Sequence, residues 1–274
     1  MKDFNTSDFE ASQDVLIEKC LDGLMQKDQL AYMGNFVRGF AHNINGMLQN
    51  ISMLSEILTR SHLKAGRLPD SEPEKIREWE EAHEAQNRRF EKLSRQIALL
   101  TDMLKDLTIL YEIQCNDSEV DINQVLDTLT RVFRADLFFK HQVELKLRTS
   151  SKLPLMRILG KDLIPALVHL FENALTAMQT TDQKRLLVET TIKDEVIEII
   201  FRDTGCGFTH ETDSGSLFDL FHSEWNEKGE SCKGQKNFLG FGLYAARRRL
   251  SPYGATIRLE RKEEETWAVI EIPT

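Results

Sequence analysis

Apolar residues between positions 30 and 111 recur at alternating steps of three and four, the spacing that gathers side chains on one face of an α-helix. One stripe runs from about Leu30 to about Leu63, and a second follows the segment 66–73, which contains two prolines. Because prolines interrupt helices, we predict two long amphipathic helices joined by a loop as an antiparallel hairpin. The first stripe consists of Met33, Val37, Phe40, Ile44, Met47, Ile51, Leu54 and Leu58, and the second of Phe90, Leu93, Ile97, Leu100, Leu104, Leu107 and Tyr111.

The first stripe is wider than packing against a single helix requires. Ala41 and Leu48 extend it beyond the two positions per heptad that form a simple seam. One hairpin would therefore leave apolar surface in contact with water. Pairing two hairpins into a four-helix bundle would bury this surface, so we expect a homodimer formed through the hairpin.

His42 lies in the first predicted helix but away from its apolar stripe. If Val37 and Ile44 occupy core position a of a heptad, His42 falls at position f, opposite the core. An exposed imidazole at neutral pH is mostly uncharged and keeps a nitrogen lone pair, so it can act as a nucleophile. The position of His42 suggests chemistry rather than packing.

The segment 1–29 has its own apolar pattern. Ile17, Leu21 and Leu24 follow a different phase from the stripe that begins at Met33. Either the helix is continuous and its seam shifts, so that an upstream twist or tilt could pass into the bundle, or this is a partly frayed N-terminal helix. We assign 1–29 as an N-terminal helical signal segment and 30–115 as the dimerisation region.

A second domain is expected from about Asp117, and we assign it to residues 116–274. Strands and helices alternate there, with consecutive strands close enough to form hairpins. This order is typical of an α/β sandwich, in which helices cover a mixed sheet, so the whole chain is predicted to be α+β. Helices are expected at about 125–139, 162–178 and 242–250, and strands at about 143–147, 186–192, 196–201, 255–260 and 267–272.

Charge and cysteine content exclude several classes of function. The net charge of −9 and the pI near 5.4 argue against nucleic acid or an anionic membrane as the main partner. The four cysteines form no Cys-x-x-Cys pair, which disfavours a zinc site and a disulfide framework. No signal peptide and no apolar run of ~18 residues is present, so we expect a cytoplasmic protein without direct membrane insertion.

Three short motifs in the second domain favour nucleotide chemistry. Asn173 lies inside an apolar predicted helix, where an amide needs a polar partner. The segment 203–208, Asp-Thr-Gly-Cys-Gly-Phe, ends a predicted strand with an acid and two glycines. The segment 239–243, Leu-Gly-Phe-Gly-Leu, leads into a helix, and free amides at a helix N-terminus bind phosphate. Taken alone, the Asn is also common as a core amide, the acid with two glycines as a turn, and the glycines before a helix as a cap.

Taken together and in this order, the motifs resemble the ATP-binding fold shared by gyrase, heat-shock chaperone, mismatch-repair and histidine-kinase ATPases. Asn173 matches the N box, 203–207 the G1 box and 240–242 the G2 box, with Leu-Phe-Asp-Leu-Phe at 217–221 as the F box between them. The segment around His42, from Leu30 to Asn45, resembles the H box of a sensor histidine kinase. The resemblance covers about residues 30–274.

The resemblance implies a role for each matching residue. Asn173 would hold Mg²⁺ against the phosphates of ATP through its amide oxygen, and Asp203 would accept a hydrogen bond from the adenine amino group. The segment between the G1 and G2 boxes would be the ATP lid. The glycines would let the backbone approach the base (Gly205, Gly207) and the phosphates (Gly240, Gly242), and the lid contains Lys228, Lys233 and Lys236, which would either neutralise phosphate charge or be ordinary loop lysines.

The same resemblance implies a two-step phosphoryl transfer. An imidazole nitrogen of His42 would attack the γ-phosphorus of ATP, and the phosphoryl group would then pass to an aspartate on the receiver domain of a response regulator. The regulator would dock below His42, although a solvated helix surface is the alternative for this face. Its residues are Gln49, Asn50, Met53 and Glu56.

Three positions depart from the family pattern. The usual acid after the histidine is Asn43, which can orient the ring but is a poor base, so slow autophosphorylation is expected. Gly46 replaces a Thr or Asn that the family links to dephosphorylation of the partner. His169 stands where many N boxes have a first Asn.

The leading interpretation is a homodimeric, ATP-dependent protein histidine kinase of a two-component system, with His42 and Asn43 as its catalytic pair. A dimeric phosphotransfer or scaffold protein with weak or lost kinase activity is the main alternative, and a conformational ATPase or serine kinase of the same superfamily is the third. The sequence before Leu30 contains no recognisable sensor domain, so we expect the chain to be either a fragment or a protein that receives its signal from another protein, a possible upstream sensor.

Overall fold

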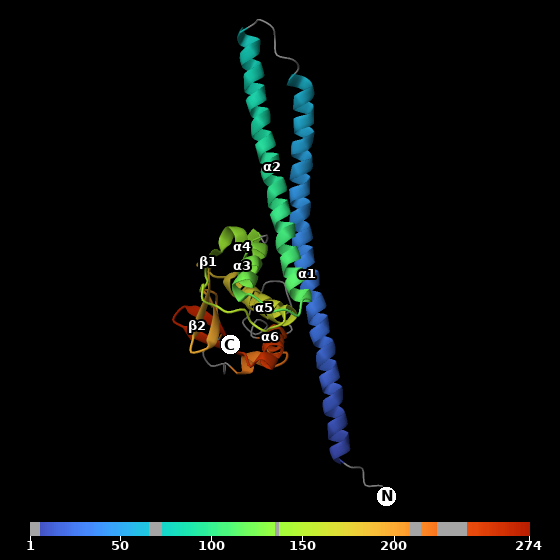
Figure 1. Ribbon diagram of the computed structural model, residues 1–274, viewed down its shortest axis with the longest axis vertical. Helices are drawn as coiled ribbons and strands as arrows, with labels where there is room; N and C mark the ends of the chain where they lie inside the picture. The colour runs from blue at the N-terminus through green and yellow to red at the C-terminus, as the bar shows by residue number, and fades with distance from the viewer. Residues whose placement is uncertain (1–5, 66–72, 135–136, 209–214, 224–239) are drawn as a thin grey trace.

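The structure is a computed structural model, and it describes residues 6–65, 73–134, 137–208, 215–223 and 240–274. Within the helices, the side chains of residues 6–14, 29–43, 62–65, 75 and 137–138 lie outside the described part. Two regions follow each other along the chain: a long helical hairpin, and a domain that combines a sheet with helices (Figure 1). The predicted α+β class is confirmed.

Two antiparallel helices form the hairpin, α1 over Thr6–Ala65 and α2 over Pro73–Cys115. The helix α1 passes without interruption through residue 30, where the sequence pattern changes phase. The apolar pattern therefore moves to a different face of one continuous helix. The predicted boundary between 1–29 and 30–115 lies inside α1.

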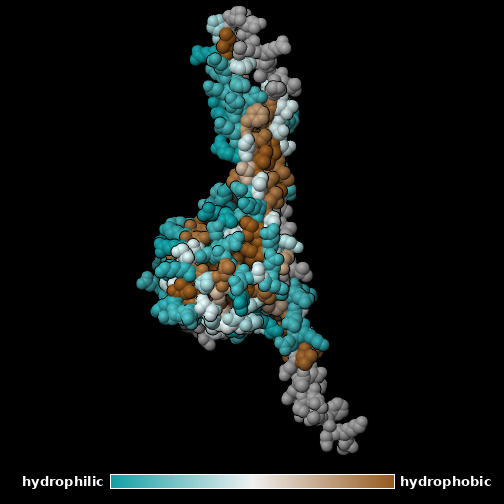
Figure 2. Space-filling model, in the orientation of Figure 1, coloured by the Kyte–Doolittle hydropathy of each residue, from teal (hydrophilic) through white to brown (hydrophobic). Residues whose placement is uncertain are grey.

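The predicted seam of α1 faces α2 wherever its side chains are described. Leu54 and Leu58 are buried, and Ile44, Met47 and Ile51 are half-buried. Their neighbours Leu48 and Met53 remain exposed, and Figure 2 shows apolar residues along the hairpin surface. One α2 helix covers only part of the apolar surface of α1.

The predicted stripe of α2 divides into two faces. The half-buried stripe members Leu93 and Leu100, with the buried Met103 beside them, lie on the face toward α1, whereas the buried Leu110 packs into the core of the second region. The other face is exposed because α2 carries more apolar residues than one α1 helix can cover. On it, four members of the stripe recur every seven residues and are 47–63% exposed: Phe90, Ile97, Leu104 and Tyr111.

The second region contains a five-stranded mixed sheet of order β1-β2-β3-β5-β4 in the described residues. The β1–β2 pair is parallel and the other pairs are antiparallel. The strands are β1 Glu144–Arg148, β2 Arg185–Lys193, β3 Val196–Asp203, β4 Thr256–Lys262 and β5 Glu265–Pro273; the helices are α3 Ile122–Phe133, α4 Leu137–Gln142, α5 Gly160–Met178 and α6 Gly242–Leu250, with short 3₁₀ turns η1 Ser216–Phe218 and η4 Ser251–Tyr253.

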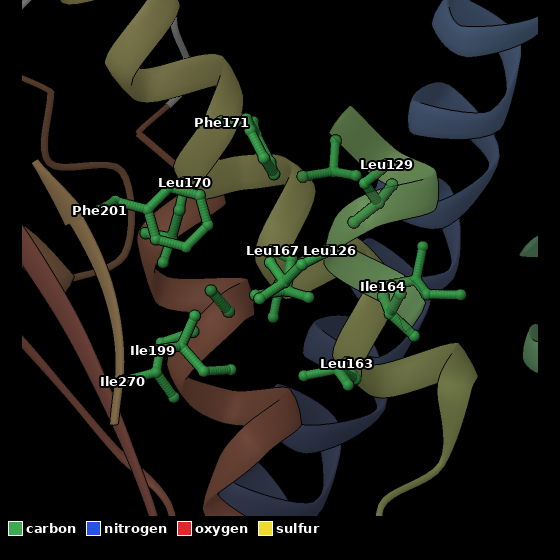
Figure 3. Packing of buried hydrophobic residues seen from close by; sticks show 14 of the residues in the cluster. Leu126, Leu129, Leu163, Ile164, Leu167, Leu170, Phe171, Ile199, Phe201 and Ile270 are labelled. Carbon is green, nitrogen blue, oxygen red and sulfur yellow. The ribbon is translucent and has the colours of Figure 1, made fainter. Parts of the chain in front are cut away.

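The core of this domain lies between the sheet and the helices α3 and α5 (Figure 3). Leu163, Leu167 and Phe171 recur every four residues on α5, so they share one face, and all are buried. Phe171 meets Phe201 of β3 edge to face, with ring centroids 4.9 Å apart. Alternate residues of β3 point into the same core, as a strand covered on one face requires.

The domain packs against the end of α2. Arg131 of α3 donates to both carboxylate oxygens of Asp106 at 2.9 and 3.0 Å. Gly160, the first residue of α5, lies so close to the carbonyl of Ile113 that a Cβ there would overlap it. Leu110 of α2 belongs to the core of the domain. The end of the hairpin is therefore attached to the domain by shared packing as well as by the chain.

Candidate nucleotide-binding site

One face of α5 connects the predicted motifs. His169, Asn173 and Ala177 are spaced by four residues and therefore lie above one another on the helix. A Cβ at Gly205 would overlap the Cβ of Ala177, and a Cβ at Gly242 would lie 3.0 Å from Nδ1 of His169. The two glycine motifs thus lie at opposite ends of this face, about 12 Å apart by helix rise, with Asn173 between them.

The first motif forms a turn directly after β3. The buried carboxylate of Asp203 accepts a hydrogen bond from the backbone N–H of Gly205 at 2.9 Å. The N–H of Cys206 donates to the carbonyl of Ala177 at 3.0 Å, which fixes the turn to the end of α5. Burial, together with the nearby negative charge of Glu265, raises the pKa of Asp203 to about 7. The turn thus holds a buried acid that ionises near neutral pH.

Arg261 of β4 stabilises the far side of this turn. Its Nη1 donates to the carbonyls of Cys206 and Phe208 at 3.0 and 2.8 Å. Gly207 has a positive φ of 63°, and a Cβ there would lie 2.7 Å from the same Nη1. Sequence reasoning missed Arg261, because an arginine in a strand 55 residues from its acceptor has no local signature.

The second motif leads into α6. Gly240 has a φ of 63°, and a Cβ there would overlap the carbonyl of His222. Phe221 returns a backbone N–H to the carbonyl of Gly240 at 3.1 Å. The side chain of the cap residue, Phe241, makes no hydrogen bond to the first amides of α6. Amides at a helix N-terminus are groups that can bind an anion.

The F box connects to α6 through one arginine. Leu217 and Phe218 are buried, and Arg247 donates to the carbonyl of Phe218 at 3.1 Å. The guanidinium of Arg247 also lies 5.2 Å from the Phe218 ring centroid. The segment 215–223 is thus held against the helix that begins at Gly242.

A family model described as "Histidine kinase-, DNA gyrase B-, and HSP90-like ATPase" matches residues 160–274. The matched residues begin at α5 and include Asn173, the Asp203 turn and the glycines before α6. Residues 160–274 form a domain of this ATPase family. Membership of the ATPase family implies that the domain binds a nucleotide.

Several solved histidine kinases are similar in structure to this chain. The mycobacterial sensor histidine kinase MprB is 19% identical over 57% of this chain and 97% of that chain, with a TM-score of 0.44. Histidine kinase AdeS of Acinetobacter baumannii is 16% identical over 82% of this chain and 94% of that chain, with a TM-score of 0.43. Full-length ShkA in complex with AMPPNP is 15% identical over 85% of this chain and 45% of that chain, with a TM-score of 0.46. A search of curated proteins gave no match.

Asn173 is the polar group of the ATPase-family domain best placed for a ligand. Its side chain is half-buried on the α5 face and makes no hydrogen bond to another described residue. The described residues contain no group of three His, Cys, Asp or Glu side chains suited to a metal. The amide oxygen of Asn173 is a donor of the kind that Mg²⁺ uses, since this ion binds one or two protein oxygens and takes its other ligands from phosphates and water.

Other predicted residues lie apart from the ATPase-family domain or outside the described residues. His42 and Asn43 lie in α1, but their side chains are outside the described part. Lys228, Lys233 and Lys236 also lie outside it. In the part of the chain that the structure covers, neither long helix nor any shorter one is apolar enough over its length to cross a membrane.

Proposed function

We propose that the protein is a cytoplasmic, homodimeric, ATP-dependent histidine kinase of a two-component system, which phosphorylates itself on His42. The observation that carries this proposal is the α5 face, which presents Asn173 between an Asp203 turn and the glycines before α6. The hairpin that contains His42 belongs to the same chain. Together these features would supply a nucleotide site and a candidate phosphoryl acceptor.

The proposed nucleotide position follows the length of the α5 face. Asp203, at one end, would accept a hydrogen bond from the adenine amino group. The amides at the start of α6, with Gly240 and Gly242 giving close access, would bind the phosphates at the other end. The Asn173 oxygen would hold Mg²⁺ between them, where the ion would neutralise phosphate charge during transfer.

In the proposed transfer, a nitrogen of the His42 imidazole forms a bond to the γ-phosphorus. The bond from phosphorus to the β,γ-bridging oxygen breaks, ADP leaves with that electron pair, and the ring loses the proton of its other nitrogen to water. Asn43 would orient the ring without accepting this proton. The phosphohistidine would then transfer its phosphoryl group to an aspartate of a response regulator.

The exposed stripe on α2 supports the homodimer. Phe90, Ile97, Leu104 and Tyr111 repeat every seven residues, the period at which two helices remain in contact along their length. A second hairpin would cover these side chains together with Leu48 of α1. The four-helix bundle formed in this way is the proposed dimerisation interface.

The test is incubation with Mg²⁺ and γ-labelled ATP, followed by treatment of the labelled protein with acid and with alkali. We expect an acid-labile, alkali-stable label that is lost in His42→Gln, with ATP affinity unchanged. Label that survives acid would identify a serine or threonine kinase instead. ATP binding without any label would favour the alternative that Asn43 motivates, a dimeric phosphotransfer or scaffold protein.

A further inference from the structure

The N-terminal half of α1 lies against α5 and α6 of the ATPase-family domain (Figure 1). In this contact, Oδ2 of Asp28 lies 3.1 Å from Nε2 of His169 and 3.7 Å from Nη2 of Arg249. Arg249 and His169 are buried, and only 14% of the Asp28 side chain is exposed. The contact therefore includes a nearly buried carboxylate from α1.

Further contacts lie toward the start of α1. Arg248 Nη2 lies 3.2 Å from a carboxylate oxygen of Glu18 and 3.4 Å from one of Asp22. Arg249 Nη2 donates to the carbonyl of Met25 at 3.1 Å. Positions 18, 22, 25 and 28 follow steps of four and three, so one face of α1 meets the two arginines of α6. We call residues 18–28 the docking segment.

The docking segment reaches the proposed phosphate position through one imidazole. Nε2 of His169 faces Asp28, while its Nδ1 would lie 3.0 Å from a Cβ at Gly242. The imidazole ring of His169 thus lies between the carboxylate of Asp28 and the amides proposed to bind the phosphates of ATP. In the docked state the carboxylate of Asp28 offsets the positive charge of Arg249 and engages His169, so it lowers the positive potential that would attract a nucleotide triphosphate, and the buried surroundings weaken screening by salt.

The docked domain also lies far from the proposed acceptor. Asp28 and His42 are 14 residues apart in one continuous helix, a separation of about 21 Å along its axis. Phosphoryl transfer requires the reacting atoms to approach to about 3–3.5 Å. In a dimer whose two-fold axis follows the bundle, His42 of the partner subunit would lie at the same height. The docked arrangement cannot transfer phosphate to either histidine.

We infer that the docking segment is an autoinhibitory site, which holds the ATPase-family domain away from His42 and opposes nucleotide binding; the first of these effects rests on the proposed function. The ion pairs with Arg248 hold the domain on α1, and Asp28 with His169 connects this contact to the phosphate position. Release of the docking segment frees the domain and favours ATP. By linkage, ATP favours release to the same extent.

The test reverses the charges of the ion pairs between Arg248 and the docking segment, first on α6 and then on α1. Arg248→Glu and the double variant Glu18→Arg/Asp22→Arg alter side chains that are partly or largely exposed, so both proteins are expected to fold, which a thermal melt verifies. Each should bind a fluorescent ATP analogue at least about fivefold more tightly and phosphorylate faster by a similar factor. The combined triple variant restores opposite charges and should return both values toward the parent.

Lys19→Glu is the matched control, because this exposed residue lies next to Glu18 but about 100° around the helix. It should leave both values unchanged. Unchanged affinity and rate in the two opening variants, or no restoration in the triple variant, would overturn the inference. If the opening variants bind nucleotide more tightly but no variant becomes labelled, the docking segment opposes nucleotide binding and the proposed kinase function is wrong. Failure of the inference and failure of the proposed function are therefore distinguishable.

Discussion

The hairpin and the ATPase-family domain use apolar residues differently. The domain places its large side chains, such as Phe171 and Phe201, in a core formed between its own sheet and helices. The hairpin leaves Ile97, Leu104 and Tyr111 exposed on α2. The domain, with the end of α2 packed into its core, is a complete packing unit within one chain, whereas the rest of the hairpin has the surface of an incomplete one. Substitutions should therefore act on association in one region and on folding or binding in the other.

Charge on the exposed α2 stripe should have the greatest effect. Ile97→Glu/Leu104→Glu would place two carboxylates in the proposed dimer interface, at a cost of about 3 kcal/mol or more, so dimerisation should weaken at least ~100-fold. Sedimentation equilibrium measures this change. Arg95→Glu, on a different face of α2, is the control and should remain dimeric. A monomeric parent protein would refute the proposed interface.

A methyl group at Gly205 should destabilise the domain without affecting association. Its Cβ would overlap that of Ala177, and overpacking of this kind costs about 1–3 kcal/mol. Gly205→Ala should therefore lower the melting temperature of the domain and weaken ATP binding, because the Asp203 turn must move. An unchanged melt would show that the turn does not pack on α5 as described.

Nucleotide affinity should depend on pH through Asp203. Its pKa of about 7 means that the carboxyl is ionised above pH 7 and protonated below it. A donor such as the adenine amino group binds the ionised form better, so ATP affinity should be constant above pH 7 and fall by up to about tenfold per unit below it. Titration by calorimetry at several pH values checks this.

Glu265→Gln provides the control for that profile. Glu265 raises the pKa of Asp203, so its neutralisation should shift the midpoint of the affinity profile to lower pH. The titration of the ATP phosphates is identical in both proteins. A midpoint that remains in place would assign the pH dependence to the nucleotide rather than to Asp203.

The smallest change is expected at Gly46, within the hairpin. A Cβ there meets nothing within 4 Å in the described residues, and alanine is favoured over glycine in a helix by about 0.5–1 kcal/mol. Gly46→Ala should raise the melting temperature of the hairpin slightly. A loss of stability would indicate that the partner hairpin approaches closely at this position.

The sequence predicted those parts of the fold that depend on local periodicity. The strands and the helices α5 and α6 lie within a few residues of their predicted ends, because burial on one side imposes regular spacing. The motif residues Asp203 and Gly242 were identified because short segments contain them. Sequence reasoning could not find Asp28 opposite His169, since these residues are 141 positions apart and their contact depends on how two regions pack.

The two faces of α2 illustrate the same limit. A step of three or four predicts that a residue lies on the apolar side of a helix, but not which neighbour will cover it. Leu100 and Leu104 both satisfy the pattern, yet Leu100 packs toward α1 and Leu104 is exposed. This choice depends on the number of helices present, which a single sequence pattern does not contain.

Because α1 is one continuous helix, it fixes the distances between the residues along it. Asp28 and His42 belong to one helix, so the spacing between the docked position and the acceptor is set by the number of residues between them. Inserting one helical turn would move them apart by about 5.4 Å with nearly the same facing, whereas inserting two residues would rotate them about 200° relative to each other. The length and the phase of this interval are therefore separate variables, and a change in either would alter which part of α1 the ATPase-family domain can reach.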